Sequence, residues 1–295
     1  MGKNTNISWT DHTFNPVIGC TKVSLGCQFC YALERDMRFY GGEHWGKGAP
    51  RHRTSAANWR EPVKWDAAYE RAFTAREDAM LIAPPGESIL PPYPNRPRVF
   101  CASLADWLDD EWPTAWRADL LMLIRATPNL DWQLLTKRPE NFLRMMGNAY
   151  ENLMCRTTGD ELDTGLLIDW RDGKPPANVW IGTSVEDQKR ADLRIPQLLA
   201  VPAKVRFLSV EPLLERVDLG MCFGHWLGAD KIDWVIAGGE SGPNRRDCGA
   251  EAIEDGIRQA KAAGVAAFCK QDCAAKPGQQ GRLSDEIFNT KEFPQ

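Results

Sequence analysis

The feature that most constrains the fold is a set of six short runs rich in β-branched and aromatic residues, which start 26 to 47 residues apart. The runs begin at residues 98, 131, 178, 204, 232 and 264, and stretches with helical periodicity such as "PTAWRADLLMLIRAT" lie between most of them. Strands that alternate with helices at this spacing pair in parallel. With "NISWTDHTF" at residues 6–14 as a further strand, the sequence predicts an α/β fold, a parallel (βα) barrel or partial barrel of the TIM-like type with about six to seven strands.

A single domain is expected to span residues 1–295, because the two interruptions of this pattern, one of them the proline-rich connector "APPGESILPPYPNRP" at residues 83–97, are too short to fold alone. The domain also carries a tryptophan- and arginine-rich insert at about residues 41–66. The second interruption, at about residues 147–177, is rich in glycine, aspartate and proline and is predicted to be irregular.

Charge and composition exclude several classes of protein. The formal net charge of −4 argues against a protein held to nucleic acid by bulk positive charge alone. The chain has no run of 18 apolar residues and its N-terminal segment lacks a signal-peptide core, so we predict a cytoplasmic protein with no membrane partner. Nine cysteines, an odd number, argue against a disulfide framework and favour metal or cluster ligation.

Three of these cysteines lie in one loop, "GCTKVSLGCQFCYA" at residues 19–32. Cys20, Cys27 and Cys30 give the pattern CxxxxxxCxxC, in which the two-residue gap lets two thiolates face one metal centre. A structural zinc site uses four protein ligands, and no further CxxC or HxxxH motif completes one here. Three thiolates with one open position suit a [4Fe–4S] cluster whose fourth iron is left for a ligand.

At this loop the sequence resembles the radical SAM superfamily, and it resembles more closely a phage-associated three-cysteine-motif family related to that superfamily. The stretch "ISWTDHTFNPVIGCTKVSLGCQFCYA", together with "GTSVED", "FLSVEPL" and "IAGGESG", carries the closer resemblance, which covers most of the chain. In the superfamily an aromatic residue commonly precedes the last cysteine, and Phe29 occupies that position here.

This resemblance implies a radical SAM barrel with an iron–sulfur cofactor. The [4Fe–4S] cluster would be held by Cys20, Cys27 and Cys30, and its open iron would bind S-adenosylmethionine. Reductive cleavage of that cofactor would give methionine and a 5′-deoxyadenosyl radical, with electrons from a donor such as flavodoxin or ferredoxin.

The sequence departs from the superfamily pattern in two ways. The usual spacing is CxxxCxxC, so the first gap here is three residues longer. The Gly-Gly-Glu motif that holds the methionine end of the cofactor normally follows the second strand, whereas Gly238, Gly239 and Glu240 follow the last predicted strand but one. We therefore do not assign these three residues the role of that motif, and they remain candidates for a site at the ends of the strands.

Polar residues follow the carboxyl end of nearly every predicted strand, and in a parallel barrel these ends share one rim where sites are built. Strand ends are also simply where chains turn polar, so each residue has a purely structural alternative. The candidate catalytic residues in this set are Asp106, Lys137, Glu240 and Lys270. The candidate cofactor-binding residues are Phe29, Ser103, Ser184, Glu186, Glu211, Gly238 and Gly239.

The loop at residues 43–65 makes nucleic acid a candidate partner, because basic side chains can bind phosphates and indoles can stack on bases. Its alternative is a loop pinned to the barrel by buried tryptophans. The basic and indole residues of the loop are Lys47, Arg51, Arg53, Arg60, Lys64, Trp45, Trp59 and Trp65.

A second class of function stays open, namely a metal-stabilised protein that binds nucleic acid without radical catalysis. In that protein a histidine or a distant cysteine such as Cys222 or Cys248 would complete a tetrahedral zinc site. Cys248, Cys269 and Cys273 could also form an auxiliary metal site, although Cys269 lies in an apolar run typical of a core strand.

Overall fold

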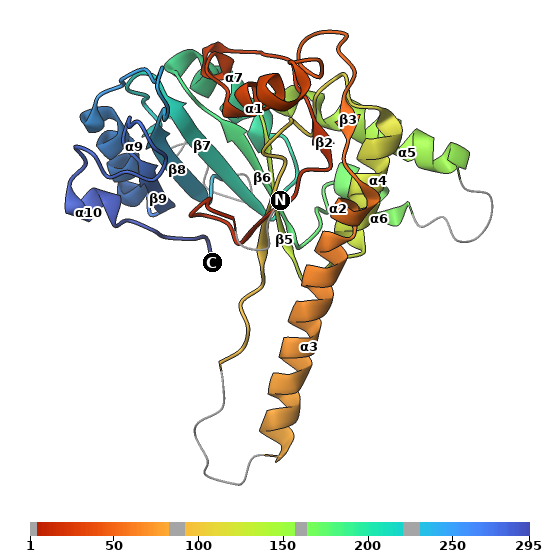
Figure 1. The fold of residues 1–295 in the computed structure, drawn as a ribbon. Coiled ribbons are helices and arrows are strands. Elements are labelled where there is room, and N and C mark those ends of the chain that lie inside the picture. Colours follow the sequence, from red (N-terminus) through yellow and green to blue (C-terminus); the bar gives the residue numbers. More distant parts are fainter. Residues whose placement is uncertain (1–4, 83–91, 157–163, 221–230) are drawn as a thin grey trace.

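The computed structural model describes residues 5–82, 92–156, 164–220 and 231–295, and it confirms the predicted α/β partial barrel. Seven parallel strands follow one another in chain order and curl into an open half-barrel with helices packed around it (Figure 1). The strands are β1 (His12–Thr13), β4 (Arg98–Cys101), β5 (Asp131–Thr136), β6 (Val179–Ser184), β7 (Val205–Leu213), β8 (Trp234–Gly239) and β9 (Ala266–Gln271).

The two faces of this sheet carry different side chains because successive residues of a strand point to opposite sides. One face packs against the helices through residues such as Ile181 and Val235. The other, concave face is filled by an aromatic cluster, and Gly182 leaves room there for the ring of Phe207, since a Cβ atom at Gly182 would lie 2.3 Å from that ring. The buried members of this aromatic cluster are Trp9, Phe100, Trp180, Val205, Phe207, Trp234, Ile236 and Phe268.

Amphipathic helices connect the strands and cover the outer face of the sheet. In the helix that precedes β9, Ile253, Ile257 and Ala260 are buried at the helical spacing that a core-facing stripe requires. The helices on this side are α4 (Thr114–Arg125), α5 (Phe142–Arg156), α6 (Gly165–Arg171), α7 (Gln188–Leu199), α9 (Ala250–Ala262) and α10 (Asp285–Phe288), and a 3-10 turn, η2 (Pro139–Asn141), precedes α5.

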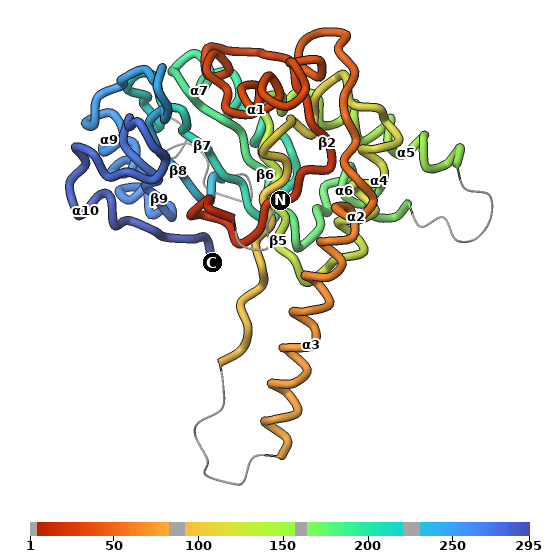
Figure 2. The backbone as a smooth tube through the Cα atoms, in the orientation of Figure 1, coloured from red at the N-terminus to blue at the C-terminus, as the bar shows by residue number. Residues whose placement is uncertain are grey.

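The first crossover, between β1 and β4, is the most elaborate. Its elements are β2 (Val17–Ile18), η1 (Leu25–Cys27), α1 (Tyr31–Tyr40), β3 (His52–Arg53), α2 (Ala56–Trp59) and α3 (Glu61–Ile82). Figure 1 shows α1 above one end of the sheet and α3 extending away from the other. In Figure 2 the segment that leads into β4 runs beside α3, where Tyr93 contacts Phe73 and Arg76.

The insert predicted to be irregular at residues 147–177 is largely helical where the structure describes it, so that prediction was wrong. Helix α5 continues to Arg156 because Met146, Ala149 and Leu153 stay buried on one face, and α6 follows from Gly165. Residues 157–163 lie outside the described part of the chain. Of the helices in the described residues, none combines the length and the apolar composition needed to cross a membrane.

Candidate cofactor site at the carboxyl ends of the strands

The loop with the three cysteines lies over the carboxyl ends of the parallel strands. Cys20 follows Gly19, whose backbone N–H donates to the carbonyl of Leu104 at 3.0 Å, just past the end of β4. Gly19 has a φ of 112°, and a Cβ atom there would lie 2.3 Å from a backbone carbonyl oxygen, so this position requires glycine. Cys27 ends η1, which packs against β7, and Cys30 immediately precedes α1.

All three thiols of this loop are reduced and partly buried, and their environments differ. Burial raises the pKa of the Cys20 thiol to about 12, with Asp106 adding to that rise and Arg138 opposing it. Burial also raises the pKa of Cys30. Burial acts in the same direction on Cys27, but the Lys137 ammonium and nearby N–H groups outweigh it, so the pKa of Cys27 lies below its usual range.

Two cations from the end of β5 lie against the cysteine sulfurs. The Lys137 ammonium acts electrostatically on both Cys27 and Cys30, and it donates a hydrogen bond to Ser184 Oγ at 2.9 Å. The Arg138 guanidinium, which is almost fully buried, donates to Cys20 Sγ at 3.7 Å. Positive charge at this end of the sheet therefore favours the thiolate of Cys27, whereas burial outweighs it at Cys20 and Cys30.

Asp106, predicted to be a catalytic candidate, has no oxygen left for a substrate. Its Oδ2 accepts from Lys137 N and from Arg138 Nη1, each at 2.9 Å, and its Oδ1 accepts from Thr136 Oγ1 at 2.7 Å and from Leu108 N at 3.0 Å. This buried carboxylate therefore holds the Arg138 guanidinium and the backbone at Lys137 in place.

Glu186 is buried beneath the cysteine loop with one oxygen unused. Its Oε2 accepts from Arg194 Nη1 at 2.7 Å, whereas its Oε1 is buried without a hydrogen-bond partner. Gly26 of the loop lies close above it, since a Cβ atom at that position would be 3.1 Å from the Glu186 side chain. An unpartnered buried carboxylate oxygen is rare and marks a position that can receive a donor from a ligand.

Four more predicted residues lie at the same rim. By the two-residue strand period, Ser184, Glu211 and Lys270 extend the concave face beyond its aromatic cluster, and the Lys270 ammonium contacts the Glu211 carboxylate. Ser103 is used structurally, because its Oγ bonds the Asn15 side chain at 2.9 Å and its carbonyl accepts from Tyr31 OH at 2.7 Å.

The predicted residues after β8 fasten the cysteine loop to the sheet. The Glu240 carboxylate binds the Arg246 guanidinium in a two-point ion pair, at 2.5 and 2.9 Å. Arg246 then donates to the carbonyl of Leu25 at 3.0 Å and to Gln28 Oε1 at 3.2 Å, and it lies 5.2 Å from the centre of the Phe29 ring. Sequence reasoning missed Arg246. The one feature of the sequence that could have indicated its role is its position shortly after the end of a predicted strand.

The two glycines of this segment have packing roles. A Cβ atom at Gly238 would lie 3.2 Å from Lys270 Cβ, and one at Gly239 would lie 2.4 Å from Cys273 Sγ. Gly239 therefore needs to be glycine so that β8 and the segment after β9 can approach each other, whereas the space at Gly238 is only tight.

Comparison with known proteins identifies a family. Residues 4–289 match the model of a family described as "Protein of unknown function (DUF5131)". The chain belongs to this family. No curated protein and no solved structure matches it.

In this family member, part of the tryptophan- and arginine-rich insert is buried. The Arg51 side chain donates to Asp109 Oδ2 at 2.7 Å and to the carbonyl of His44 at 3.0 Å, and Trp65 stacks on His12 with ring centres 4.2 Å apart. Neither Arg51 nor Trp65 can contact a nucleic acid, whereas Lys47, Arg60 and Lys64 are exposed. The insert is thus pinned to the barrel, as its structural alternative proposed, with a basic edge left at the surface.

The other cysteines do not form the predicted three-membered auxiliary site. Cys269 is buried on the helix-covered face, while Cys248 and Cys273 contact each other elsewhere, and Cys222 lies outside the described residues. Within the described ranges, no three His, Cys, Asp or Glu side chains, including those of the cysteine loop, meet around a point that a single metal ion could occupy.

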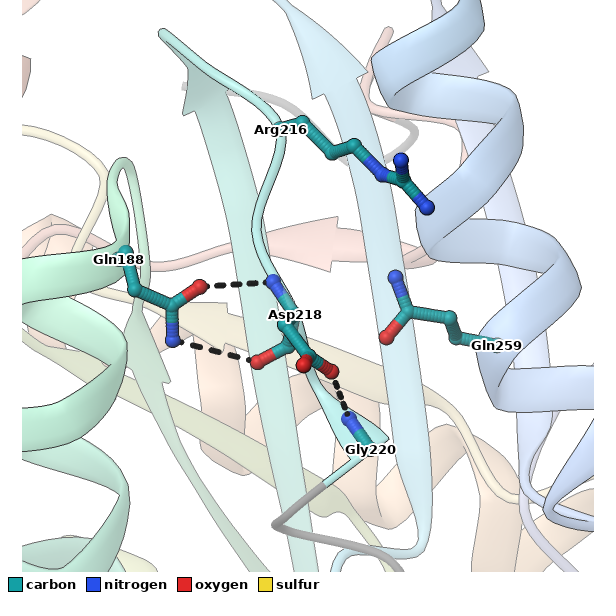
Figure 3. Close-up of a pocket in the computed structure, with 5 residues that line it drawn as sticks. All are labelled: Gln188, Arg216, Asp218, Gly220 and Gln259. Atoms are coloured by element: carbon teal, nitrogen blue, oxygen red, sulfur yellow. Dashed lines mark hydrogen bonds between the residues drawn. The ribbon is translucent and has the colours of Figure 1, made fainter.

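A cavity of about 600 Å³ lies on the helix side of the sheet, between α7 and α9, and is lined by Gln188, Arg216, Asp218, Gly220 and Gln259 (Figure 3). Gln188 Oε1 accepts from Asp218 N at 2.7 Å, and Asp218 Oδ1 accepts from Gly220 N at 2.8 Å. These polar groups satisfy one another, so the cavity offers less to a charged ligand than the rim does.

Proposed function

We propose that this protein is a radical SAM-like iron–sulfur enzyme, in which Cys20, Cys27 and Cys30 hold a [4Fe–4S] cluster. The observation that carries the proposal is the placement of three reduced thiols of one loop over the carboxyl ends of a parallel partial barrel, next to Lys137 and Arg138. When bound, the cluster would supply an electron to the sulfonium of S-adenosylmethionine, cleaving it to methionine and a 5′-deoxyadenosyl radical.

The donor set would suit such a cluster, because one loop supplies three thiols and leaves one iron without a protein ligand. A structural zinc ion needs four ligands about 2.3 Å from one point. Within the described residues, no three His, Cys, Asp or Glu side chains meet around such a point. Cys248, which the zinc alternative offers as a fourth ligand, contacts Cys273 instead, with 3.5 Å between the sulfurs.

The side chains of the chain itself would bind and orient the cofactor. The free Glu186 Oε1 can accept from an ammonium or hydroxyl group, and Glu211 and Ser184 offer further acceptors on the concave side. Lys137 and Arg138 would balance the charge of the thiolates. The aromatic cluster beneath the rim would exclude water from that side.

The first test is anaerobic purification followed by quantitation of iron, sulfide and zinc and an EPR spectrum of the reduced protein with and without S-adenosylmethionine. We expect about four irons per chain and a spectrum that changes when the cofactor is added. Replacing Cys27 by serine should abolish iron binding, whereas the matched replacement of the exposed Cys155 should not. Stoichiometric zinc without iron would refute the proposal and support the zinc alternative.

The partners that we propose are an electron donor of the flavodoxin or ferredoxin class and a nucleic acid or nucleotide-linked substrate. Reduced thiols and a reducible cluster suit the cytoplasm. The exposed Lys47 and Arg60 support nucleic-acid binding, since their side chains could reach phosphates. Lys64 is also exposed, but its ammonium is paired with Glu61 at 2.5 Å. Fluorescence anisotropy with a labelled single-stranded oligonucleotide should show weaker binding after Lys47 and Arg60 are replaced by alanine, but not after the control change of the exposed Lys174. Equal binding by all three proteins would remove this substrate class.

A further inference from the structure

Two cysteines outside the proposed cluster site lie in contact although they come from different segments. Cys248 precedes α9 and Cys273 follows β9, and their sulfur atoms are 3.5 Å apart. Both side chains are partly buried, and the sulfur of Cys273 lies against the end of β8, where only a glycine, Gly239, leaves it room. The fold therefore brings these two thiols together at one edge of the sheet.

The two segments are joined independently of the sulfurs. Arg282 donates to Asp247 Oδ1 and Oδ2, each at 2.8 Å, and to Asp272 Oδ1 and Oδ2, each at 2.9 Å. Each aspartate directly precedes one of the two cysteines in the sequence. Because this ion-pair network fixes both backbones, the sulfurs need to approach by only about 1.5 Å to reach disulfide bonding distance.

The environment also prepares one thiol to react. The hydrogen bond shared by the two sulfurs, together with backbone N–H groups, lowers the pKa of Cys273 to about 7, although burial and Asp247 oppose the change. The same contact raises the pKa of Cys248. Cys273 is therefore the attacking thiolate and Cys248 the resolving thiol.

We propose that Cys248 and Cys273 form a reversible intramolecular disulfide by exchange with a low-molecular-weight disulfide such as oxidised glutathione. The Cys273 thiolate attacks one glutathione sulfur, which forms a mixed disulfide and releases one glutathione thiolate. That thiolate takes the proton of Cys248, whose sulfur then attacks the Cys273 sulfur and releases the second glutathione. Two protein thiols are oxidised and one glutathione disulfide is reduced to two thiols, so no other reactant is needed.

This bridge would join the end of β9 to the segment that also carries Arg246, the residue that binds the carbonyl of Leu25 in the cysteine loop. Oxidation of the pair would thus add a covalent link to the ion pairs with which Arg282 already holds that segment. The inference does not depend on the proposed radical chemistry, because neither Cys248 nor Cys273 is assigned to the cluster.

The test uses the full-length reduced chain, treated with oxidised glutathione, blocked with iodoacetamide and digested with trypsin without reduction. Trypsin cuts after Arg246, Arg258, Lys270 and Arg282, so the bridge links the peptides 247–258 and 271–282 and leaves Cys269 in a separate peptide. We expect this linked pair by mass spectrometry, and its loss after dithiothreitol. Recovery of both peptides unlinked, while the exposed Cys155 carries glutathione, would overturn the proposal.

Two variants and a pH series make the test specific. Cys248→Ser should stop at the glutathione adduct of Cys273, whereas Cys155→Ser should still form the bridge.

Because the thiolate fraction of a group with a pKa of about 7 rises roughly tenfold between pH 6 and pH 8, the bridge should form about tenfold faster at the higher pH. A rate that does not change over this range would overturn the role of Cys273. A chain with Cys20, Cys27 and Cys30 replaced by alanine should form the bridge equally well, which separates this inference from the proposed function.

Discussion

Replacing Arg138 by methionine should destabilise the protein strongly, because this guanidinium is the centre of a buried network beneath the cysteine loop. It donates to Asp106 Oδ2 at 2.9 Å, to the carbonyl of Thr21 at 2.6 Å and to Cys20 Sγ at 3.7 Å. Only 4% of its side chain is exposed, and a second carboxylate, that of Asp109, lies 3.4 Å away. Methionine keeps an unbranched apolar stem and removes the charge and all the hydrogen bonds of the side chain.

The expected loss follows from what the two carboxylates retain. Removing one partner of a buried ion pair typically costs about 3–5 kcal/mol, since the other charge is left without compensation. Asp106 would keep its bonds to Thr136 and to backbone N–H groups, and Asp109 would keep Arg51 at 2.7 Å. We therefore expect a loss at the lower end of this range, about 3 kcal/mol in the free energy of unfolding.

Urea unfolding of the metal-free protein, followed by tryptophan fluorescence and extrapolated to water, measures this difference. Arg144→Met is the matched control, because Arg144 also pairs with an aspartate, Asp110 at 2.5 Å, but half of its side chain is exposed. That exposed pair should contribute only about 0–1 kcal/mol. A loss below about 1 kcal/mol for Arg138→Met, equal to that of the control, would refute the view that this network holds the loop.

Three further changes test other parts of the structure. Gly182→Ala should cost about 1–3 kcal/mol in urea unfolding, because the new methyl group would overlap the ring of Phe207; an unchanged midpoint would contradict the tight packing of the concave face. Arg246→Ala should release the cysteine loop and speed its cleavage by protease under native conditions, and equal cleavage rates would contradict the clamp. The Arg282 guanidinium lowers the pKa of Asp247 to about 2, so the contribution of Asp247 to stability is complete above pH 3.8 and disappears as the pH falls through 2. Arg282→Met should remove this part of the decrease in the free energy of unfolding between pH 4 and pH 2. The same decrease in the variant and in the unchanged protein would contradict this role of the ion pair.

The strands of the partial barrel could be predicted from the sequence because each is a compact apolar run bounded by turn residues. The run "DWQLLT" matches β5 residue for residue, and the predicted strands at 178 and 232 overlap β6 and β8 almost completely. Local composition misled at residues 147–156, where Gly147 and the nearby polar residues suggested a loop. Burial of Met146, Ala149 and Leu153 in the hydrophobic core, where α5 packs beside α4 and α6, outweighs the low helix propensity of that glycine.

The location of the candidate site was also predictable, whereas the role of each side chain was not. Parallel strands bring their carboxyl ends to one edge, so residues after different strands were expected to meet, and Lys137 does meet Ser184. Which partner a charge selects depends on contacts distant in sequence. Asp106 forms an ion pair with Arg138, and Glu240 forms one with Arg246. Arg51 is buried against Asp109 and is not exposed at the surface.

Glu186 differs from these carboxylates, and the difference bears on what the rim is for. Every oxygen of Asp106 and Glu240 is bonded within the chain, so those groups are fully used in holding the fold. Glu186 is as deeply buried but binds Arg194 through one oxygen only, and its other oxygen lies beneath the cysteine loop without a donor. A buried polar atom without a partner costs about 1–3 kcal/mol. Because Gly26 of the cysteine loop lies directly above Glu186, a ligand bound at that loop in the proposed function could supply the missing donor.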